Sequence, residues 1–231
     1  AASLWAVDGI VLRPSLYSLA VPLVVFIESA VVAILLTPFF IKRFSSLKQL
    51  KKKDWLAFFG VALLGGAVGT MAITKALFYV NFINLSVVIL LQKLQPVFAI
   101  SLATIFLKEK LPKEFFLWAG LAIFGAYFMT FGFSSPNFST GDKTTIAALF
   151  ALLAAFSFSS STVLSKRALR NVDYEMGTYL RFLFATIIML MIASTTGDIS
   201  NISEITTKQI IVFLIIAFTT GGAAIFLYYY G

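Results

Sequence analysis

Five charged side chains lie within long apolar stretches of this sequence, where a charge is energetically unfavourable. They are Asp8, Glu28, Lys75, Lys93 and Arg181. A charge at the centre of a membrane-spanning helix costs about 2.5–3.5 kcal/mol even on a lenient insertion scale, so such residues face a polar interior and mark solute or proton pathways. We therefore take these five side chains as the first candidates for function.

The densest polar pattern is LLQKLQPVFAI, residues 90–100. At about 100° per residue, Gln92, Lys93, Gln95 and Pro96 occupy an arc of roughly 160° on a helix, which leaves the rest for leucine and isoleucine. Pro96 also frees a backbone carbonyl one turn earlier, near Gln92, and such breaks are tolerated where the freed groups meet protein or water. This polar wall predicts a place where a solute binds.

Depth in the membrane suggests how the charges combine. Lys93 and Glu28 both lie near the middle of their stretches, so we expect them to pair, with Asp8 somewhat nearer the outer surface. In a solute site, Lys93 would contact an anionic group, the two glutamines would donate and accept hydrogen bonds, and Asp8 or Glu28 would balance charge or carry a coupling proton.

Two of the charges have simpler alternatives. Arg181 lies in the inner half of its stretch, where it would either line the polar interior or snorkel to the interface beside Asp173 or Glu175. Lys75, near the outer end of its stretch, would likewise snorkel outward.

The composition requires a membrane. Hydrophobic residues make up 60% of the 231 positions and charged residues 12%, against about 45–50% and 25% in ordinary soluble domains. The basic excess lies in short connections, which the positive-inside effect explains without nucleic acid. The chain has no cysteine and no histidine, so thiolate chemistry is absent, no metal-ligand spacing occurs and no cofactor is implied.

The elements that must position these residues are apolar stretches of about the length that spans a bilayer. Eight stretches lie at residues 1–12, 18–41, 55–79, 84–107, 114–133, 144–165, 175–196 and 208–231. They predict an all-α, polytopic transmembrane helix bundle. We expect the first and last helices to be incomplete and further helices to be missing.

Basic residues in the connections predict the orientation. Twelve lie on one side: Lys42, Arg43, Lys48, Lys51, Lys52, Lys53, Lys108, Lys110, Lys113, Lys166, Arg167 and Arg170. Only Arg13, Lys143 and Lys208 lie on the other. The richer side is cytoplasmic by the positive-inside rule, which places the N-terminus inside.

The polar stretch SSPNFSTGDKT, residues 134–144, divides the chain into two weakly similar parts, 1–135 and 136–231. Glu28 falls opposite Arg181 when the parts are aligned. The connection at 42–53 carries six basic residues, while its counterpart at 197–207 carries none. Opposite loop charge is what an inverted repeat of five-helix units requires, the second unit being truncated. The alternative is two unrelated sets of helices.

The run LQKLQPVFAISLATIFLKEKL, residues 91–111, resembles the fourth-helix signature of EamA-type transporters of the drug/metabolite transporter superfamily. Pro96, Glu109 and Leu111 match its proline, acidic residue and leucine, and LWAVDGIVLR resembles the Trp-containing first helix. The resemblance implies ten helices in two inverted five-helix units, with a substrate site at their centre. Glu28 departs from the arginine common at its position, whereas Arg181 keeps that residue type, and Lys93 is not part of the general signature.

These observations predict a secondary transporter that exports a small polar metabolite, such as an amino acid, by alternating access. A bacterial inner membrane follows from the resemblance, and a homodimer is left open. An intramembrane enzyme acting on lipid-linked substrates is an alternative without a visible nucleophile and base. A sensor or assembly subunit is another, in which the charges would fix only helix register.

Overall fold

Helices form every regular element of the computed structural model, which describes residues 2–41, 47–48, 50–80, 85–107, 110–134, 143–170 and 172–230. Seven helical spans in these ranges are long and apolar enough to cross a membrane: Val21–Phe40, Lys52–Tyr79, Leu85–Phe106, Glu114–Phe131, Lys143–Ala168, Tyr174–Thr195 and Thr207–Tyr230. The predicted all-α polytopic bundle is confirmed.

The first predicted stretch forms a short helical run of three types. The α-helix α1 (Ala2–Val7) is followed by the π-helix η1 (Asp8–Leu12) and the 3-10 helix η2 (Arg13–Leu16). The run thus extends past residue 12, where the sequence predicted its end, and it includes Arg13, which the sequence placed in a loop.

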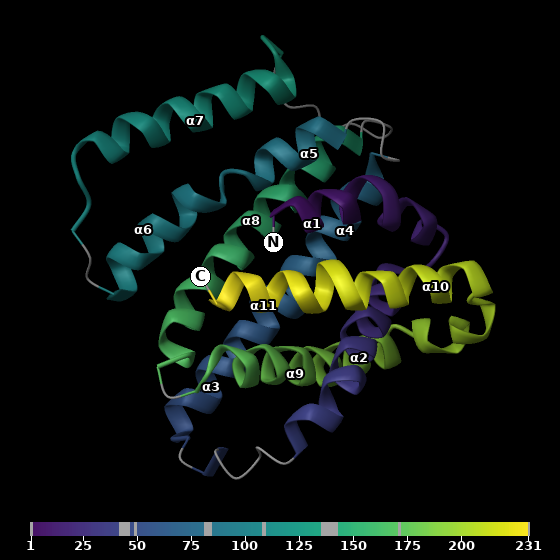
Figure 1. Cartoon of the computed structure of the whole chain (residues 1–231). Coiled ribbons are helices and arrows are strands. Elements are labelled where there is room, and N and C mark those ends of the chain that lie inside the picture. The colour runs from purple at the N-terminus through teal and green to yellow at the C-terminus, as the bar shows by residue number, and fades with distance from the viewer. Residues whose placement is uncertain are drawn as a thin grey trace. The chain divides into compact units, whose positions relative to one another are not determined.

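The other spans divide into the elements labelled in Figure 1. They are α2 (Val21–Phe40), α3 (Lys52–Val61), η4 (Ala62–Val68), α4 (Gly69–Tyr79), α5 (Leu85–Gln92), α6 (Gln95–Leu107), α7 (Glu114–Phe131), α8 (Lys143–Ala168), α9 (Tyr174–Thr195), η5 (Asp198–Glu204), α10 (Thr207–Ile216), η6 (Ala217–Gly221) and α11 (Gly222–Tyr230).

The chain forms two compact units. Unit 1 comprises residues 1–67 and 164–231, and unit 2 comprises residues 68–163. Each unit therefore has its own set of packed helices. The predicted repeats, 1–135 and 136–231, are a division of the sequence and stay a prediction.

Unit 1 is organised around the packing of α2 along α9 (Figure 1). Phe40 of α2 stacks on Tyr179 of α9, with ring centroids 5.4 Å apart. The backbone of η4 also comes close to α9 at small residues. A Cβ added to Gly66 of η4 would lie only 2.7 Å from the Cβ of Ala185 of α9. Close approach at small residues is how helices associate in a bilayer, where apolar burial supplies little drive.

Local signals in the sequence account for the ends of α9 and α10. The carboxylate of Asp173 accepts a hydrogen bond from the Met176 amide (2.8 Å) and so caps α9 at its start. Gly197 ends the helix with φ +80°, a conformation that favours glycine. Thr206 and Gln209 form a reciprocal capping box at the start of α10.

Unit 2 contains the helix break that Pro96 predicted. α5 ends at Gln92 and α6 begins at Gln95. The Ser159 hydroxyl, on α8, lies 2.7 Å from the Gln95 carbonyl oxygen, so a carbonyl at the start of α6 meets protein rather than lipid. The broken helix is thereby accommodated within the unit.

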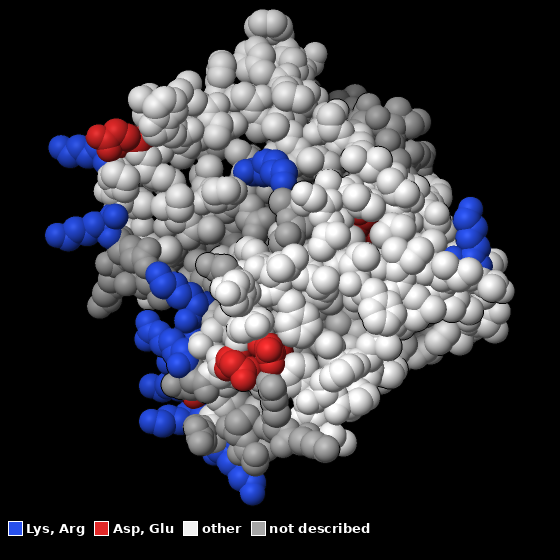
Figure 2. Space-filling model, in the orientation of Figure 1, with Lys and Arg blue, Asp and Glu red and all other residues white. Residues whose placement is uncertain are grey.

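The surface has the apolar character that a bilayer needs. Most of the face in Figure 2 carries neither basic nor acidic side chains. On α7, Phe116, Trp118 and Phe124 are 62–67% exposed. Water would disfavour such a helix, whereas lipid tails solvate it.

The close contact at Gly66 predicts a packing defect on substitution. Gly66→Ala should lower the melting temperature in detergent, because the new Cβ meets Ala185 at 2.7 Å and overpacking costs about 1–3 kcal/mol. The control is Gly120→Ala on α7, whose Cβ would meet nothing within 4 Å and which should leave melting unchanged or raise it slightly. Equal melting temperatures would contradict the packing described.

Candidate functional site

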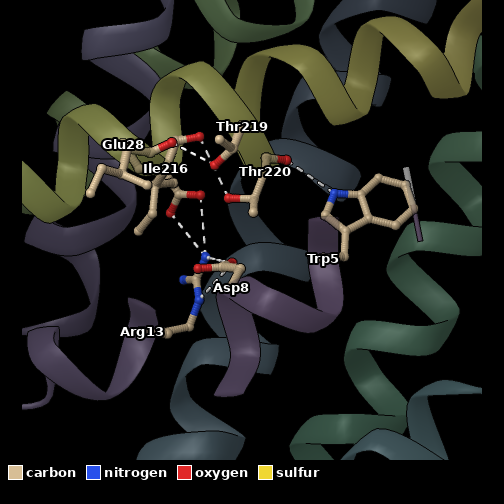
Figure 3. Close-up of polar contacts among 8 residues, drawn as sticks. Trp5, Asp8, Arg13, Glu28, Ile216, Thr219 and Thr220 are labelled. Atoms are coloured by element: carbon tan, nitrogen blue, oxygen red, sulfur yellow. Dashed lines mark hydrogen bonds and ion pairs between the residues drawn. The ribbon is translucent and has the colours of Figure 1, made fainter. Parts of the chain in front are cut away.

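A buried ion cluster joins the first helical run to α2 (Figure 3). The Arg13 guanidinium donates to Asp8 Oδ2 from Nη2 (2.6 Å) and from Nε (3.1 Å). The same Nη2 lies 3.2 Å from Glu28 Oε1 and 3.3 Å from Oε2. One guanidinium therefore serves two carboxylates, and all three side chains lie inside unit 1.

The π-helix η1 explains why Asp8 and Arg13 meet. In an α-helix, residues five apart point about 140° away from each other. In η1 the Arg13 amide instead bonds to the Asp8 carbonyl, the i to i+5 pattern of a π-turn. Arg13 thus lies one turn beyond Asp8, close enough for its side chain to reach the carboxylate.

The cluster contains two carboxyl groups and a single guanidinium. Asp8, Arg13 and Glu28 are only 8%, 4% and 8% exposed. Within the described residues, Arg13 is the one cation within ion-pair distance of either carboxylate. Asp8 Oδ1 is buried without a hydrogen-bond partner there. Such a group is costly and calls for a functional explanation.

Neutral hydrogen bonds hold the first helical run against α10 and η6. Trp5 Nε1 donates to the Thr220 carbonyl oxygen (3.1 Å; Figure 3). The Gln209 side-chain amide donates to the Ser15 carbonyl oxygen of η2 (3.5 Å) and to Ser18 Oγ just beyond the run (3.0 Å). The Trp5 ring also lies 5.6 Å from that of Tyr228. These contacts are between uncharged groups, whereas the contact of the first helical run with α2 is an ion pair.

Arg181, on α9, is a second buried charge in unit 1. It is 8% exposed, and Nη1 donates to Tyr229 Oη (3.2 Å) on α11. The Tyr229 hydroxyl also lies 3.1 Å from Ser165 Oγ, and the guanidinium carbon is 6.0 Å from the centre of the tyrosine ring. No carboxylate lies within ion-pair distance of Arg181 among the described residues.

The structure gives Glu28 and Arg181 partners that the sequence did not name. Arg13 contacts Glu28, and the pairing of Glu28 with Lys93, which belongs to unit 2, stays a prediction. Arg181 is buried against Tyr229, which agrees with the polar-interior alternative for this residue. The structure brings Asp8 and Glu28 together, as the sequence predicted for two of the outer charges.

The other candidate residues lie in unit 2. Lys75 is exposed on α4, and its ammonium lies 5.1 Å from the centre of the Phe150 ring and 5.9 Å from that of Tyr79. Lys93 and Pro96 are exposed at the break between α5 and α6, where Gln92 and Gln95 are half-buried. Glu109 lies outside the described residues.

Sequence reasoning missed Arg13 and Tyr229. Arg13 stands just beyond an apolar stretch, where it was counted among the loop cations. Asp8, an acid in an apolar stretch to which the sequence gave no basic partner of its own, was the signal that could have identified it. Tyr229 belongs to the run FLYYY, which was interpreted only as apolar, although a tyrosine hydroxyl buried in a helix needs a polar partner.

The described residues contain no group of three His, Cys, Asp or Glu side chains that could hold a metal ion. The chemistry of the two buried sites is instead that of ion pairs, hydrogen bonds and aromatic rings. These groups can bind a polar solute or a proton without a covalent step.

Comparison with known proteins gives a consistent identification. The EamA-like transporter family matches residues 1–131 and 145–231. A protein named riboflavin transporter ImpX, from Fusobacterium nucleatum, is 47% identical over the whole chain, which spans 78% of that protein. An uncharacterized transporter, sll1164 from Synechocystis, is 28% identical over 64% of the chain and 42% of its own length. No solved structure matches.

The ion cluster predicts a strong structural role for Arg13. Arg13→Gln should lower the melting temperature in detergent by at least about 5 °C, because removing one partner of a buried ion pair costs about 3–5 kcal/mol. Lys208→Gln removes an exposed positive charge from α10 and serves as the control. If both variants have the same melting temperature as the unaltered protein, the buried cluster is not formed as described.

Proposed function

The chain belongs to the EamA-like transporter family, and on that premise we propose that it moves riboflavin or a closely related flavin across the cell membrane. It is a multi-pass membrane transporter rather than an enzyme. The observation that carries the substrate proposal is the 47% identity to a named riboflavin transporter over the whole chain. This replaces the amino acid as the leading substrate.

The side chains around Arg181 support a flavin. Riboflavin presents a flat ring system whose dicarbonyl edge accepts hydrogen bonds, and it carries no charge at neutral pH. A buried guanidinium is a rigid array of donors suited to such a planar edge. Arg181 donates one of its hydrogen bonds to Tyr229, which fixes its position. We propose that Arg181 recognises the dicarbonyl edge.

Aromatic side chains of unit 1 suit the flat faces of the ring. Trp5 and Tyr228 lie 5.6 Å apart, and Tyr228 and Tyr229 lie 5.9 Å apart. Rings at these distances pack on each other, so we propose that a planar solute stacks on the outer face of this aromatic group rather than between its rings. Gln92, Lys93 and Gln95, which belong to unit 2, remain proposed solute contacts on the sequence pattern alone.

Alternating access between two inverted repeats is the proposed mechanism. The repeats are residues 1–135 and 136–231, with a cytoplasmic N-terminus in a bacterial inner membrane. A coupling proton is the proposed source of energy. Export, the direction expected from the sequence, is included in the proposal and is tested with vesicles loaded from inside.

Flux in proteoliposomes tests the substrate directly. The protein should carry radiolabelled riboflavin, and a large excess of unlabelled riboflavin should compete while an amino acid mixture should not. Release from preloaded vesicles, compared with uptake, gives the direction. Saturable transport of an amino acid without transport of riboflavin would overturn the proposal.

Arg181 provides the sharpest variant for recognition. Arg181→Gln should reduce riboflavin flux at low concentration by about 10-fold or more, because a hydrogen bond to a charged donor contributes about 1.5–3 kcal/mol. Arg167→Gln, an exposed position at the end of α8, is the matched control. Equal riboflavin flux in the two variants would show that Arg181 does not bind the solute.

Cysteine labelling tests the orientation, because the chain has no cysteine of its own. In intact cells, an impermeant maleimide should label Ser200→Cys in η5 and should label Lys53→Cys in α3 only after permeabilisation, as loop charge predicts. The reverse pattern would place the N-terminus outside.

A further inference from the structure

We propose that Asp8, Arg13 and Glu28 form a proton-operated latch, in which one proton on Glu28 releases the first helical run from α2 and so couples solute movement to proton movement. The identity of the solute rests on the proposed function. The latch itself rests on the buried ion cluster, on the unpaired oxygen of Asp8 and on the way the first helical run is held.

The charge balance of the cluster calls for one proton. Two carboxylates share the single positive charge of Arg13, which leaves one negative charge in excess when both acids are ionised. That charge is buried, and Asp8 Oδ1 has no hydrogen-bond partner within the described residues. Uptake of one proton makes the cluster neutral and removes the cost of the excess charge.

The distances indicate which acid takes the proton. Arg13 makes two hydrogen bonds to Asp8 Oδ2, the shorter of 2.6 Å. It reaches Glu28 only through Nη2, at 3.2 and 3.3 Å. Short charged bonds are the strong ones. Glu28 is therefore the weaker partner of Arg13 and the acid that accepts a proton at lower cost.

No other charged side chain on the surrounding elements faces the cluster. On α9, Arg181 bonds to Tyr229. On α10, Lys208 is exposed, and on η5, Glu204 is exposed while Asp198 accepts a hydrogen bond from Thr196. On η6, the Thr219 and Thr220 hydroxyls donate to the Ile215 and Ile216 carbonyls. In the part of the chain that the structure describes, Arg13 is thus the one Lys or Arg within ion-pair distance of Asp8 and Glu28.

Protonation changes one contact of the first helical run and leaves others intact. Once Glu28 is neutral, Arg13 keeps Asp8 as its charged partner, and the ionic contact to α2 is lost. The bond from Trp5 to Thr220 and that from Gln209 to the Ser15 carbonyl oxygen carry no charge and persist. The run then remains attached to α10 and η6 but can separate from α2. The first helical run thus has two states, attached to α2 or separated from it, and proton binding favours the separated state.

The proton step needs no other reactant. A proton from water on one side of the membrane binds a Glu28 carboxylate oxygen to form the neutral acid. The same O–H bond breaks when the proton leaves to water on the other side. An uncharged solute gains nothing directly from the membrane potential, whereas a proton that moves with it or against it does.

The first experiment measures riboflavin flux in proteoliposomes with and without an imposed pH gradient. The gradient should drive accumulation of riboflavin to at least about fivefold above equilibrium in the unaltered protein. Glu28→Gln cannot take the proton, and in Asp8→Asn the cluster is already neutral without it, so riboflavin flux in both variants should no longer respond to the pH gradient. Asp198→Asn, on η5, should respond like the unaltered protein.

The outcomes separate the two proposals. Absence of riboflavin flux in the unaltered protein overturns the proposed substrate. Riboflavin flux that does not respond to the pH gradient overturns the latch, and so does a full response to the gradient in either Glu28→Gln or Asp8→Asn.

A second readout needs no solute and also shows whether the variants fold. Trp5 lies on the first helical run, and its fluorescence can be isolated by replacing Trp55 and Trp118 with phenylalanine. Its emission should shift once as the pH is varied in the unaltered protein, because the run leaves α2 when Glu28 takes the proton. The shift should be absent in Glu28→Gln and present in Asp198→Asn. A shift that survives Glu28→Gln would contradict the latch.

Discussion

A buried charge must find its partner inside the protein, because the bilayer offers none. This constraint shapes unit 1. Glu28 lies inside a membrane-spanning helix, and its partner Arg13 comes from a separate helical run that a π-turn has rotated into place. Arg181 has no carboxylate among the described residues, and it relies on the hydroxyl and ring of Tyr229. In a soluble protein these charged side chains would lie at the surface. In unit 1 they are buried and link neighbouring helices.

The two buried sites lie on helices that pack against each other. Glu28 is on α2 and Arg181 is on α9, and these helices form the central pair of unit 1 (Figure 1). The two residues also stand opposite each other when the two parts of the sequence are aligned. The positions that align therefore carry opposite charges, and each is satisfied by a different neighbour. In the function proposed above, the acid takes up the proton and the guanidinium binds the polar solute.

The sequence predicted the fold class, the spans and the need for polar surroundings at Asp8, Glu28 and Arg181, because these follow from hydropathy and the cost of buried charge. It also predicted the break at Pro96, which follows from a missing amide. It could not predict that Arg13 joins the cluster, since α-helical geometry points residue 13 away from residue 8 and only the π-turn reverses this. Nor could it predict the partner of Glu28 or the role of Tyr229, because depth and residue type do not specify which helices are neighbours.

The most direct test of the one-proton cluster is the number of protons that move with each solute molecule. Proteoliposomes are given a riboflavin gradient and an opposing pH gradient, with the membrane potential held at zero. The pair of gradients at which net riboflavin flux is zero is then determined. One excess carboxylate predicts that a riboflavin gradient of about tenfold is balanced by a pH difference of about one unit. Net flux that always runs down the riboflavin gradient, whatever the pH difference, would contradict the account.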